Sequence, residues 1–307
     1  MSDYKYSIEA KNVNKIFYKK SKKINALVDF NINIERGSIH GLLGPNGAGK
    51  STFINILGGL VKKNNGEVKV CGIDIDKNSK LSKFKIGIVP QELNIDPFFS
   101  PSELLELQAG LYGIPKKKRI TEEILENLKL TDQRNAYART LSGGMRRRLL
   151  IAKALVHSPE MLILDEPTAG VDIDIRSSVW KYIKKINNTG TTICLTTHYL
   201  EEAEKLCKNI TIINKGRIIA NDTKENLLNI ISIKEVSFVL TNNFKLNDKI
   251  KNLEHTIKKN ILTIKYDKHK MNLSKIIKIL DGADIQFSEI STSESSLEDT
   301  FLKLLKT

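Results

Sequence analysis

Cysteine is scarce in this chain, and long apolar runs are missing. The three cysteines, Cys71, Cys194 and Cys207, lie far apart, with no CxxC pair and no Cys/His cluster at zinc spacing. They are therefore expected to be reduced thiols in a reducing compartment. No uninterrupted apolar stretch approaches the ~20 residues that span a bilayer, and the first residues contain no apolar signal segment. We expect a cytoplasmic chain that reaches a membrane surface only through a partner.

Internal repeats and low-complexity tracts are also absent. Of the 307 residues, 40% are apolar and 27% are charged, which argues against disorder and fibrous repeats. The length allows one large domain and a smaller one. The net charge of +14 favours an anionic partner, either nucleic acid, a headgroup surface or a phosphorylated ligand. Charge alone does not distinguish among these three.

The apolar pattern predicts two kinds of strand. Residues 30–35 alternate apolar and polar, and Val68 and Val70 do the same, as half-buried antiparallel strands do. Three continuous apolar runs, at 39–43, 161–164 and 192–195, instead suit buried parallel strands. Each of these three runs ends in polar residues.

Between residues 92 and 158 the apolar period becomes helical. Ser102 is expected to cap a helix, Thr121 to cap a second one, and residues 146–157 to form a third. After residue 232 arginine disappears, and the pattern becomes strand, strand, helix, strand, helix. The predicted organisation is a domain over 1–232 with a helical subdomain over about 92–158, and a small α/β accessory domain over 233–307.

A glycine-rich segment follows the predicted strand over 39–43 and precedes a predicted helix. Its pattern, GxxxxGK[ST], is that of a P-loop in the context that such a loop requires. Glycines let main-chain N–H groups curl around a phosphate, and the helix N-terminus adds positive charge. Lys50 supplies a mobile charge for the β- and γ-phosphates, and Ser51 offers an oxygen to Mg²⁺. The predicted phosphate-binding residues are Gly44, Pro45, Asn46, Gly47, Ala48, Gly49, Lys50, Ser51 and Thr52.

Two adjacent carboxylates, Asp165 and Glu166, end the predicted strand that starts at Met161. Because successive strand residues point to opposite sides, the two should have different roles. Asp165 suits Mg²⁺ held through water, and Glu166 suits a general base for an attacking water. An alternative is that the pair only caps the turn at Pro167, but the presence of a P-loop favours catalysis.

A second anion cradle is predicted where Ser142, Gly143 and Gly144 precede the helix over 146–157. Ser-Gly-Gly at a helix N-terminus points N–H groups at an anion. Such a cradle is redundant within a chain that already has a P-loop. It is useful if it serves the nucleotide of another copy of the chain.

These motifs, taken in order, resemble those of the ATP-binding cassette (ABC) ATPases over residues 8–225. Further matches are Gln91 after Val89-Pro90, Asp172 in Ala-Gly-Val-Asp, and His198 at the end of an apolar strand. The resemblance implies an α/β fold, with a P-loop NTPase (RecA-like) core, an antiparallel β subdomain and an α-helical subdomain, plus the small C-terminal α/β domain. It also implies ATP hydrolysis, with ATP and Mg²⁺ bound.

Within one subunit, the resemblance implies a role for three side chains. Phe17 would stack on adenine, and Tyr18 is the second candidate for this role. The alternative is that the ring is only a buried aromatic of the core. Gln91 would reach the Mg²⁺ and water site and report its state to a partner. His198 would contact the γ-phosphate.

Between subunits, the resemblance implies an ATP sandwich. Ser142, Gly143 and Gly144 would touch the γ-phosphate bound by the opposite subunit, and Asp172 would line the interface. Two ATP molecules would thus join a head-to-tail homodimer, which hydrolysis would release.

Details of the signature resemble the ABC-2 type export subfamily. Met145 stands where the commonest family form has Gln, and three arginines follow it. The segments 169–172 and 296–302 also match that type. This implies an exporter ATPase that acts with a separate ABC-2 type permease, at the cytoplasmic face of the inner (plasma) membrane. Docking is expected beside Gln91, with Phe98 and Phe99 as apolar anchors or, equally, as packing of the helical subdomain.

Two other functions are compatible with parts of the sequence. A soluble ABC ATPase acting on nucleic acid or ribosomes is suggested by the basic runs 116–119 and 146–148. The stretch between Lys50 and Ser142 is too short for the long coiled coil that chromosome-type members of the family insert there. Ribosome-associated members usually carry two cassettes in one chain, whereas this chain has a single P-loop. The basic runs are therefore interpreted as solvated faces, or as faces turned to anionic headgroups, and no nucleic acid is expected. An importer ATPase shares every catalytic residue and is disfavoured by the subfamily details alone.

Overall fold

The computed structural model describes residues 4–19, 22–170, 173–231, 233–241, 250, 253–268, 270–293 and 296–306. The chain divides into two compact units, Met1–Lys224 and Glu225–Thr307, so the division falls earlier than residue 232. Asp172, expected at a subunit interface, lies outside the described residues. Within the described ranges, no helix has the length and apolar character that crossing a bilayer requires.

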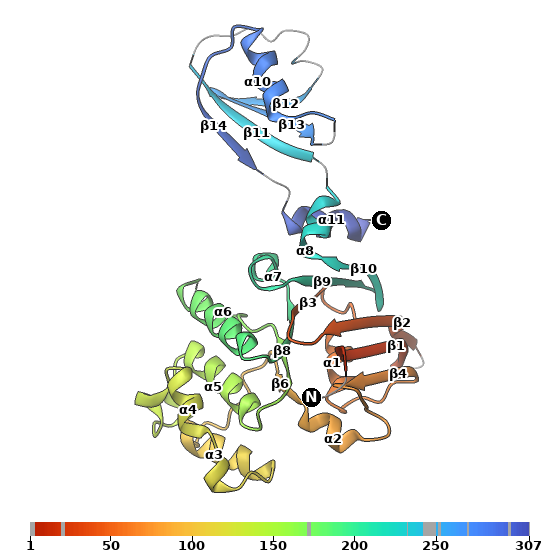
Figure 1. The fold of residues 1–307 in the computed structure, drawn as a ribbon, viewed down its shortest axis with the longest axis vertical. Coiled ribbons are helices and arrows are strands. Elements are labelled where there is room, and N and C mark those ends of the chain that lie inside the picture. The colour runs from red at the N-terminus through yellow and green to blue at the C-terminus, as the bar shows by residue number, and fades with distance from the viewer. Residues whose placement is uncertain are drawn as a thin grey trace. The chain divides into compact units, whose positions relative to one another are not determined.

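A six-stranded sheet forms the centre of the first unit, in the order β10-β9-β3-β8-β7-β6 (Figure 1). Its strands are β3 (Ile39–Leu43), β6 (Ile86–Val89), β7 (Met161–Asp165), β8 (Thr192–Thr197), β9 (Asn209–Asn214) and β10 (Arg217–Thr223). All but β10 run parallel, which confirms the three predicted parallel strands. Because their carboxyl ends share one edge, the segments after β3, β6, β7 and β8 meet there.

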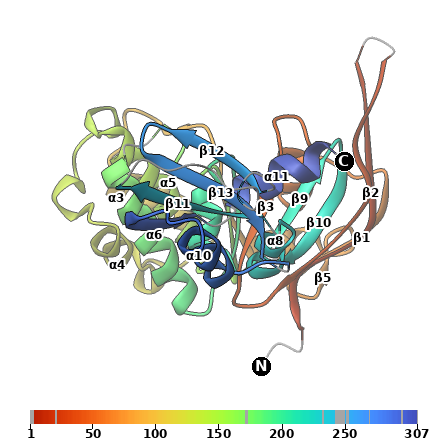
Figure 2. The ribbon, with the colours of Figure 1, turned by 90° about the horizontal axis from the view of Figure 1, so that it is seen from above.

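An antiparallel sheet in the order β2-β1-β4-β5 packs beside the central sheet. Its strands are β1 (Tyr6–Lys19), β2 (Lys22–Glu35), β4 (Asn65–Val70) and β5 (Ile73–Asp74). Helix α1 (Lys50–Leu57) lies between the two sheets (Figure 1), and β1 and β2 form a long hairpin (Figure 2). Its residues Phe53, Ile54, Ile56 and Leu57 are all buried, and the Phe53 ring is 4.7 Å from that of Phe30. A helix that is apolar on most sides is stable here because it is covered on most sides.

The remaining helices of this unit flank the central sheet (Figure 1). They are α2 (Ser79–Phe84), α3 (Pro101–Leu111), α4 (Thr121–Asn127), α5 (Gly143–Leu155), α6 (Ile173–Asn188) and α7 (Leu200–Leu206), with 3₁₀ turns at Lys116–Lys118, Thr131–Gln133 and Ala138–Thr140. The helical period predicted between 92 and 158 is confirmed by α3, α4 and α5.

Two predicted helix caps are wrong. Helix α3 is capped by Ser100, not Ser102, because Ser100 and Glu103 form a capping box with Pro101 at the first helical position. Helix α4 begins at Thr121 without a side-chain cap. The Thr121 hydroxyl instead donates to the carboxylate of Glu106 on α3.

The interpretation of the arginine run as a solvated face is also wrong. Arg147 has 1% of its surface exposed, and Arg146 and Arg148 are half-buried. Arg147 shares a helix face with Ile151 one turn later, and Ile151 is buried. The helical period therefore turns this arginine inward. The lysines at 116–118, in contrast, are exposed as expected.

The second unit is built on an antiparallel sheet in the order β12-β13-β11-β14. Its elements are the helix α8 (Lys224–Asn229), which starts at the end of the first unit, then β11 (Ile233–Leu240), β12 (Glu254–Lys258), β13 (Ile261–Asp267), α10 (Leu273–Asp281), β14 (Phe287–Ser293) and α11 (Leu297–Lys306). Three strands precede α10 where two were predicted. Ile276 and Leu280 of α10 pack with Phe238 and Ile264 in a separate apolar core.

Candidate active site

The P-loop connects β3 to α1 at the carboxyl edge of the central sheet. Gly49 adopts φ 116°, and a Cβ at this position would lie 2.5 Å from the main-chain oxygen of Ala26 on β2. Glycine is therefore required both by backbone conformation and by space. Residues 45–47 are exposed, so the open side of the loop faces solvent.

Lys50 is the buried cation of this loop, with 7% of its surface exposed. Its Nζ donates to the main-chain oxygens of Gly44, at 2.6 Å, and Pro45, at 3.1 Å. Burial lowers the pKa of Lys50, while the negative charges of Glu166 and Asp165 counteract this. The ammonium group of Lys50 is therefore close enough to interact electrostatically with both carboxylates. Ser51 is exposed and Thr52 is half-buried on the first turn of α1.

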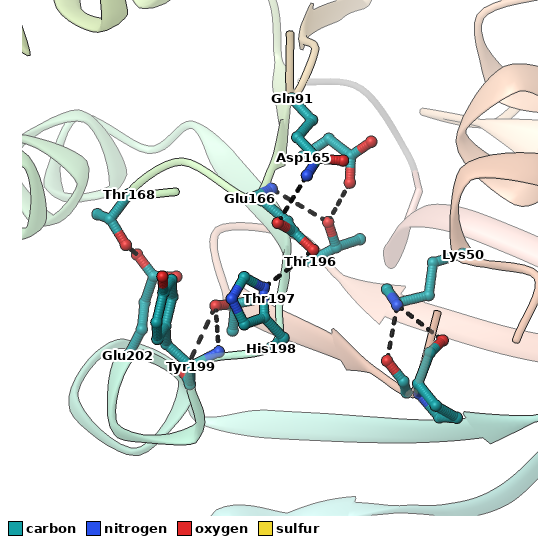
Figure 3. Close-up of polar contacts among 12 residues, drawn as sticks. Lys50, Gln91, Asp165, Glu166, Thr168, Thr196, Thr197, His198, Tyr199 and Glu202 are labelled. Atoms are coloured by element: carbon teal, nitrogen blue, oxygen red, sulfur yellow. Dashed lines mark hydrogen bonds and ion pairs between the residues drawn. The ribbon is translucent and has the colours of Figure 1, made fainter. Parts of the chain in front are cut away.

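Glu166 follows β7 and is the centre of a group of polar side chains (Figure 3). Its Oε2 accepts from Nε2 of Gln91 at 3.0 Å, and its Oε1 lies 3.1 Å from Nδ1 of His198. Gln91 follows β6 and His198 follows β8, so three neighbouring strand ends supply the three side chains. Glu166 is buried, whereas Gln91 is exposed and the His198 side chain is half-exposed. Lys50 lies across from this group in Figure 3.

The carboxylate of Asp165, the last residue of β7, has a different partner from that of Glu166. Its Oδ1 accepts from the hydroxyl of Thr196, the residue with which it pairs on β8. Among the described residues the other carboxylate oxygen of Asp165 has no hydrogen-bond partner, so it can take another ligand. The two acidic residues are therefore held by different partners.

The donors near the P-loop fit Mg²⁺ as a nucleotide complex. The hydroxyl of Ser51, the carboxylate of Asp165 and the amide oxygen of Gln91 are hard oxygen ligands of the kind Mg²⁺ prefers. Because Gln91 turns its Nε2 toward Glu166, its oxygen is not used in that contact. Across the described ranges, no group of three or more His, Cys, Asp or Glu side chains is arranged to hold a metal ion. Phosphate oxygens would therefore have to complete the coordination.

The signature residues occupy the first turn of α5. Ser142 is the N-cap, and its Oγ accepts from the main-chain N–H of Met145 at 3.2 Å. Its hydroxyl proton remains available to an anion. Ser142 is exposed, and a Cβ on Gly143 would meet nothing within 4 Å. The early N–H groups of a helix lack intrahelical acceptors, so this end is open to an anion from outside, and Gly144 beside it is buried.

The aromatic candidates lie on the hairpin that supports the P-loop. Phe17 on β1 pairs with Ile24 on β2, close to Ala26, which contacts Gly49. Phe17 is 37% exposed and Tyr18 is 74% exposed, and neighbouring strand residues face opposite sides. Neither ring is a buried core aromatic.

Sequence reasoning missed two residues that hold the site. Thr196 binds Asp165, and Glu202 on α7 accepts from the hydroxyl of Thr168 at 3.0 Å and from Nε1 of Trp180 at 2.9 Å. Burial raises the pKa of Glu202, and the hydrogen bonds to it counteract this. Glu202 thereby joins the segment after Glu166 to α6. Neither side chain was assigned a role from the sequence, because their partners come from other parts of the chain.

Known proteins resemble this chain in sequence and in structure. The family model described as "ABC transporter" matches residues 27–169. The linearmycin resistance ATP-binding protein LnrL of Bacillus subtilis (strain 168) is 41% identical over 222 residues, which are 72% of this chain and 70% of that protein. The daunorubicin resistance ATP-binding protein DrrA2 of Streptomyces coeruleorubidus is 32% identical over 97% of this chain and 95% of that protein. A dimeric ATP-binding cassette in a post-hydrolysis state, bound to ADP and Pi, matches 70% of this chain and 98% of that chain, with 29% identity and a TM-score of 0.63.

Proposed function

The chain belongs to the ABC transporter family, and from that premise we propose that it is the ATP-hydrolysing subunit of a membrane exporter that acts as a homodimer. The chain is an ATPase with the P-loop NTPase fold, and it binds ATP. The observation that carries the proposal is the buried Glu166, which lies between Gln91 and His198 and across from Lys50 (Figure 3).

In the proposed reaction, Glu166 is the general base for the attacking water. Its contacts with Gln91 and His198 support this, because they fix both carboxylate oxygens near the open side of the P-loop. Lys50 exchanges its two main-chain acceptors for phosphate oxygens, which are stronger partners for an ammonium group. His198, whose ring is half-exposed, is placed to donate to the γ-phosphate.

Mg²⁺ would be held by Ser51, Gln91 and Asp165 together with phosphate oxygens. When bound, it neutralises charge on the β- and γ-phosphates. The Thr196 hydroxyl orients Asp165 for this role. Phe17 is the proposed stacking partner of adenine, because it is partly exposed on the hairpin next to the P-loop.

The proposed homodimer places Ser142, Gly143 and Gly144 against the nucleotide of the partner. The exposure of Ser142 and the open space around Gly143 support this, because an anion can approach this helix end only from outside the chain. Asp172 is proposed to line the same interface. The dimeric state of the ATP-binding cassette with ADP and Pi also supports it.

The proposed exporter partner is an ABC-2 type permease at the cytoplasmic face of the inner membrane. Two of the relatives are named for resistance to linearmycin and daunorubicin, which supports export. Phe98 supports docking beside Gln91, since it is 67% exposed and the guanidinium of Arg139 lies 5.7 Å from its ring centroid. Phe99 is half-buried, so Phe98 is the better anchor.

Affinity purification of tagged Glu166→Gln protein from detergent-solubilised native membranes, with ATP and Mg²⁺, tests this function. We expect a multi-span membrane protein to co-purify in stoichiometric amount. Adding Phe98→Ala should reduce its recovery, whereas Leu60→Ala, at an 80% exposed apolar residue elsewhere in the first unit, should not. Recovery of ribosomes or nucleic acid without a membrane protein would contradict the exporter function.

A further inference from the structure

Arg147 is a buried cation next to the site, and the proposed reaction does not use it. It belongs to the second turn of α5, the helix that Ser142 caps, and it is 1% exposed. Burying a guanidinium group is costly unless its hydrogen-bond donors are satisfied. Its partners therefore indicate what it does.

The partners of Arg147 within the described residues are main-chain oxygens from two loops. Nη1 donates to the oxygens of Pro90, at 2.7 Å, and Gln91, at 3.1 Å. Nε donates to the main-chain oxygen of Pro167 at 2.9 Å. Nη2 donates to the main-chain oxygens of Asp165, at 3.3 Å, and of Glu166. A guanidinium group has five N–H donors, so these contacts use all of them.

The charge of Arg147 strengthens this arrangement. Burial lowers the pKa of Arg147, and the charges of Asp165, Glu202 and Glu166 counteract that. A guanidinium group keeps its proton in proteins, so each carbonyl accepts a charge-assisted hydrogen bond. One side chain on α5 thus holds both the segment after β6 and the segment after β7.

The backbone of Glu166 depends on this support. Glu166 has φ 49°, a left-handed conformation that a non-glycine residue adopts only when its surroundings enforce it. Its N–H donates to the main-chain oxygen of Thr196 at 3.0 Å and to the Thr196 hydroxyl at 3.2 Å. Its carbonyl accepts from Arg147. The peptide groups on both sides of Glu166 are thus fixed, and these set the direction of its carboxylate.

We propose that Arg147 is a positioning residue for ATP hydrolysis, which fixes Gln91 and Glu166 relative to the helix that carries Ser142. Through this one side chain, the segments that carry Gln91 and Glu166 are linked to the helix that carries the signature cradle. This inference rests on the proposed roles of Glu166 and Ser142. Arg147 acts through main-chain groups, and no contact joins it to the P-loop in the described residues.

The test compares steady-state ATP hydrolysis of Arg147→Gln and wild type. We expect kcat to fall about 100-fold, because a displacement of about 1 Å at a reacting group costs that much. The KM for ATP should stay within about twofold, because Lys50 and its loop are untouched. Arg147→Lys should remain impaired, because one ammonium group cannot replace a fork that reaches both loops.

Arg148→Gln is the matched control. Arg148 lies next to Arg147 on α5 and also donates to main-chain oxygens, those of Leu128, at 2.8 Å, and Lys129, at 3.3 Å. Those acceptors lie at the end of α4, away from the site. We expect kcat of Arg148→Gln to stay within about threefold of wild type, even if both variants melt at lower temperature. An equal loss of kcat in the two variants would overturn the proposal.

Glu166→Gln separates this inference from the proposed function. If Arg147 acts by positioning Glu166, replacing Arg147 in the Glu166→Gln variant should lower kcat little further. Fully additive losses would overturn positioning, as would wild-type kcat in Arg147→Gln or Arg147→Lys. Wild-type turnover in Glu166→Gln alone would instead overturn the proposed base. If Arg147→Gln does not fold, Arg147→Lys, which retains charge and length, carries the test.

Discussion

The two anion cradles of this chain are built in opposite ways. The P-loop is enclosed by its own chain: its lysine is buried, and Gly49 packs directly against the main chain of β2. The signature cradle lies at the surface, with Ser142 exposed and open space beside Gly143. Both use the N-terminus of a helix, yet only the first already contains the cation that completes it. The difference supports the proposal that the first cradle serves this chain and that the second serves another copy.

The surroundings of the two helices account for this difference. Helix α1 lies between two sheets and is buried around most of its circumference, so its N-terminus is fixed by the core. Helix α5 is held by its buried face and by Ser142 as a cap. Its first turn therefore remains accessible to a partner.

Removing the base should stop hydrolysis while leaving both cradles intact. For Glu166→Gln we expect kcat to fall about 1,000-fold, since general base catalysis contributes on the order of 10²–10⁴. ATP binding should persist, because the phosphate-binding residues are unchanged. The ATP-bound dimer should then accumulate, as measured by size-exclusion chromatography with light scattering. A variant that turns over like wild type would contradict the assignment of the base.

Removing the ammonium group of Lys50 should weaken nucleotide binding by the P-loop. For Lys50→Ala we expect ATP affinity to fall by roughly 100- to 1,000-fold, because charge-assisted hydrogen bonds contribute about 1.5–3 kcal/mol each. Fluorescent-nucleotide titration measures this loss. The signature cradle should be unaffected, so mixing this variant with Glu166→Gln should still form mixed dimers with one bound ATP. Unchanged affinity would show that the lysine does not bind phosphate.

Removing the hydroxyl of Ser142 should affect only the signature cradle. For Ser142→Ala we expect kcat to fall about 100-fold, because a lost donor to a reacting oxyanion costs that much. ATP affinity of the monomer should stay within about twofold. Ser288→Ala, at an exposed serine of the second unit, is a suitable control. A loss of monomer affinity equal to the loss of kcat would mean that Ser142 serves its own nucleotide.

Lowering the pH should reduce the unfolding free energy of the first unit, which is a smaller effect than those of the three substitutions. His40 on β3 is buried beside the Thr211 hydroxyl, at 2.8 Å, and burial lowers its pKa from 6.5 to about 4. Between these values the unfolded chain binds a proton that the folded chain does not, so stability is complete above pH 6.5 and falls as pH decreases. At pH 5 this costs about 2 kcal/mol of unfolding free energy.

Urea unfolding followed by the fluorescence of Trp180, the single tryptophan, measures this dependence. His40→Gln should lose about 2 kcal/mol less than wild type between pH 7 and pH 5. The Thr189→Ser variant, at an exposed position of the same unit, should follow wild type. Equal pH dependence in wild type and His40→Gln would exclude His40 as the cause.

Sequence patterns predicted the parts of the fold that depend on neighbours along the chain. Continuous apolar runs identified β3, β7 and β8, because buried parallel strands need apolar side chains on both faces. The P-loop pattern likewise follows from local needs, since Gly49 must adopt a positive φ next to a helix N-terminus. The cap of α3 was misplaced by two residues, although Ser100 and Glu103 formed a readable capping box.

Side chains whose partners are distant in sequence could not be predicted in this way. Helical periodicity places Arg147 on the buried face of α5, but it does not reveal the carbonyls that stabilise the charge there, because these belong to the segments after β6 and β7. Thr196 and Glu202 were missed for the same reason. A charged residue is stable in a core only when tertiary structure brings acceptors to it.

The sequence alone determined the family, and it placed the proposed cradles and acidic pair, because phosphate binding and hydrolysis require particular residue types at short, fixed spacing. Tertiary structure decided how these groups are held. The order of strands brings Gln91, Glu166 and His198 together at one sheet edge, and a buried guanidinium group holds the loops that carry two of them. Hydrogen bonds are short-ranged, so contacts between distant segments exist only once the chain has folded.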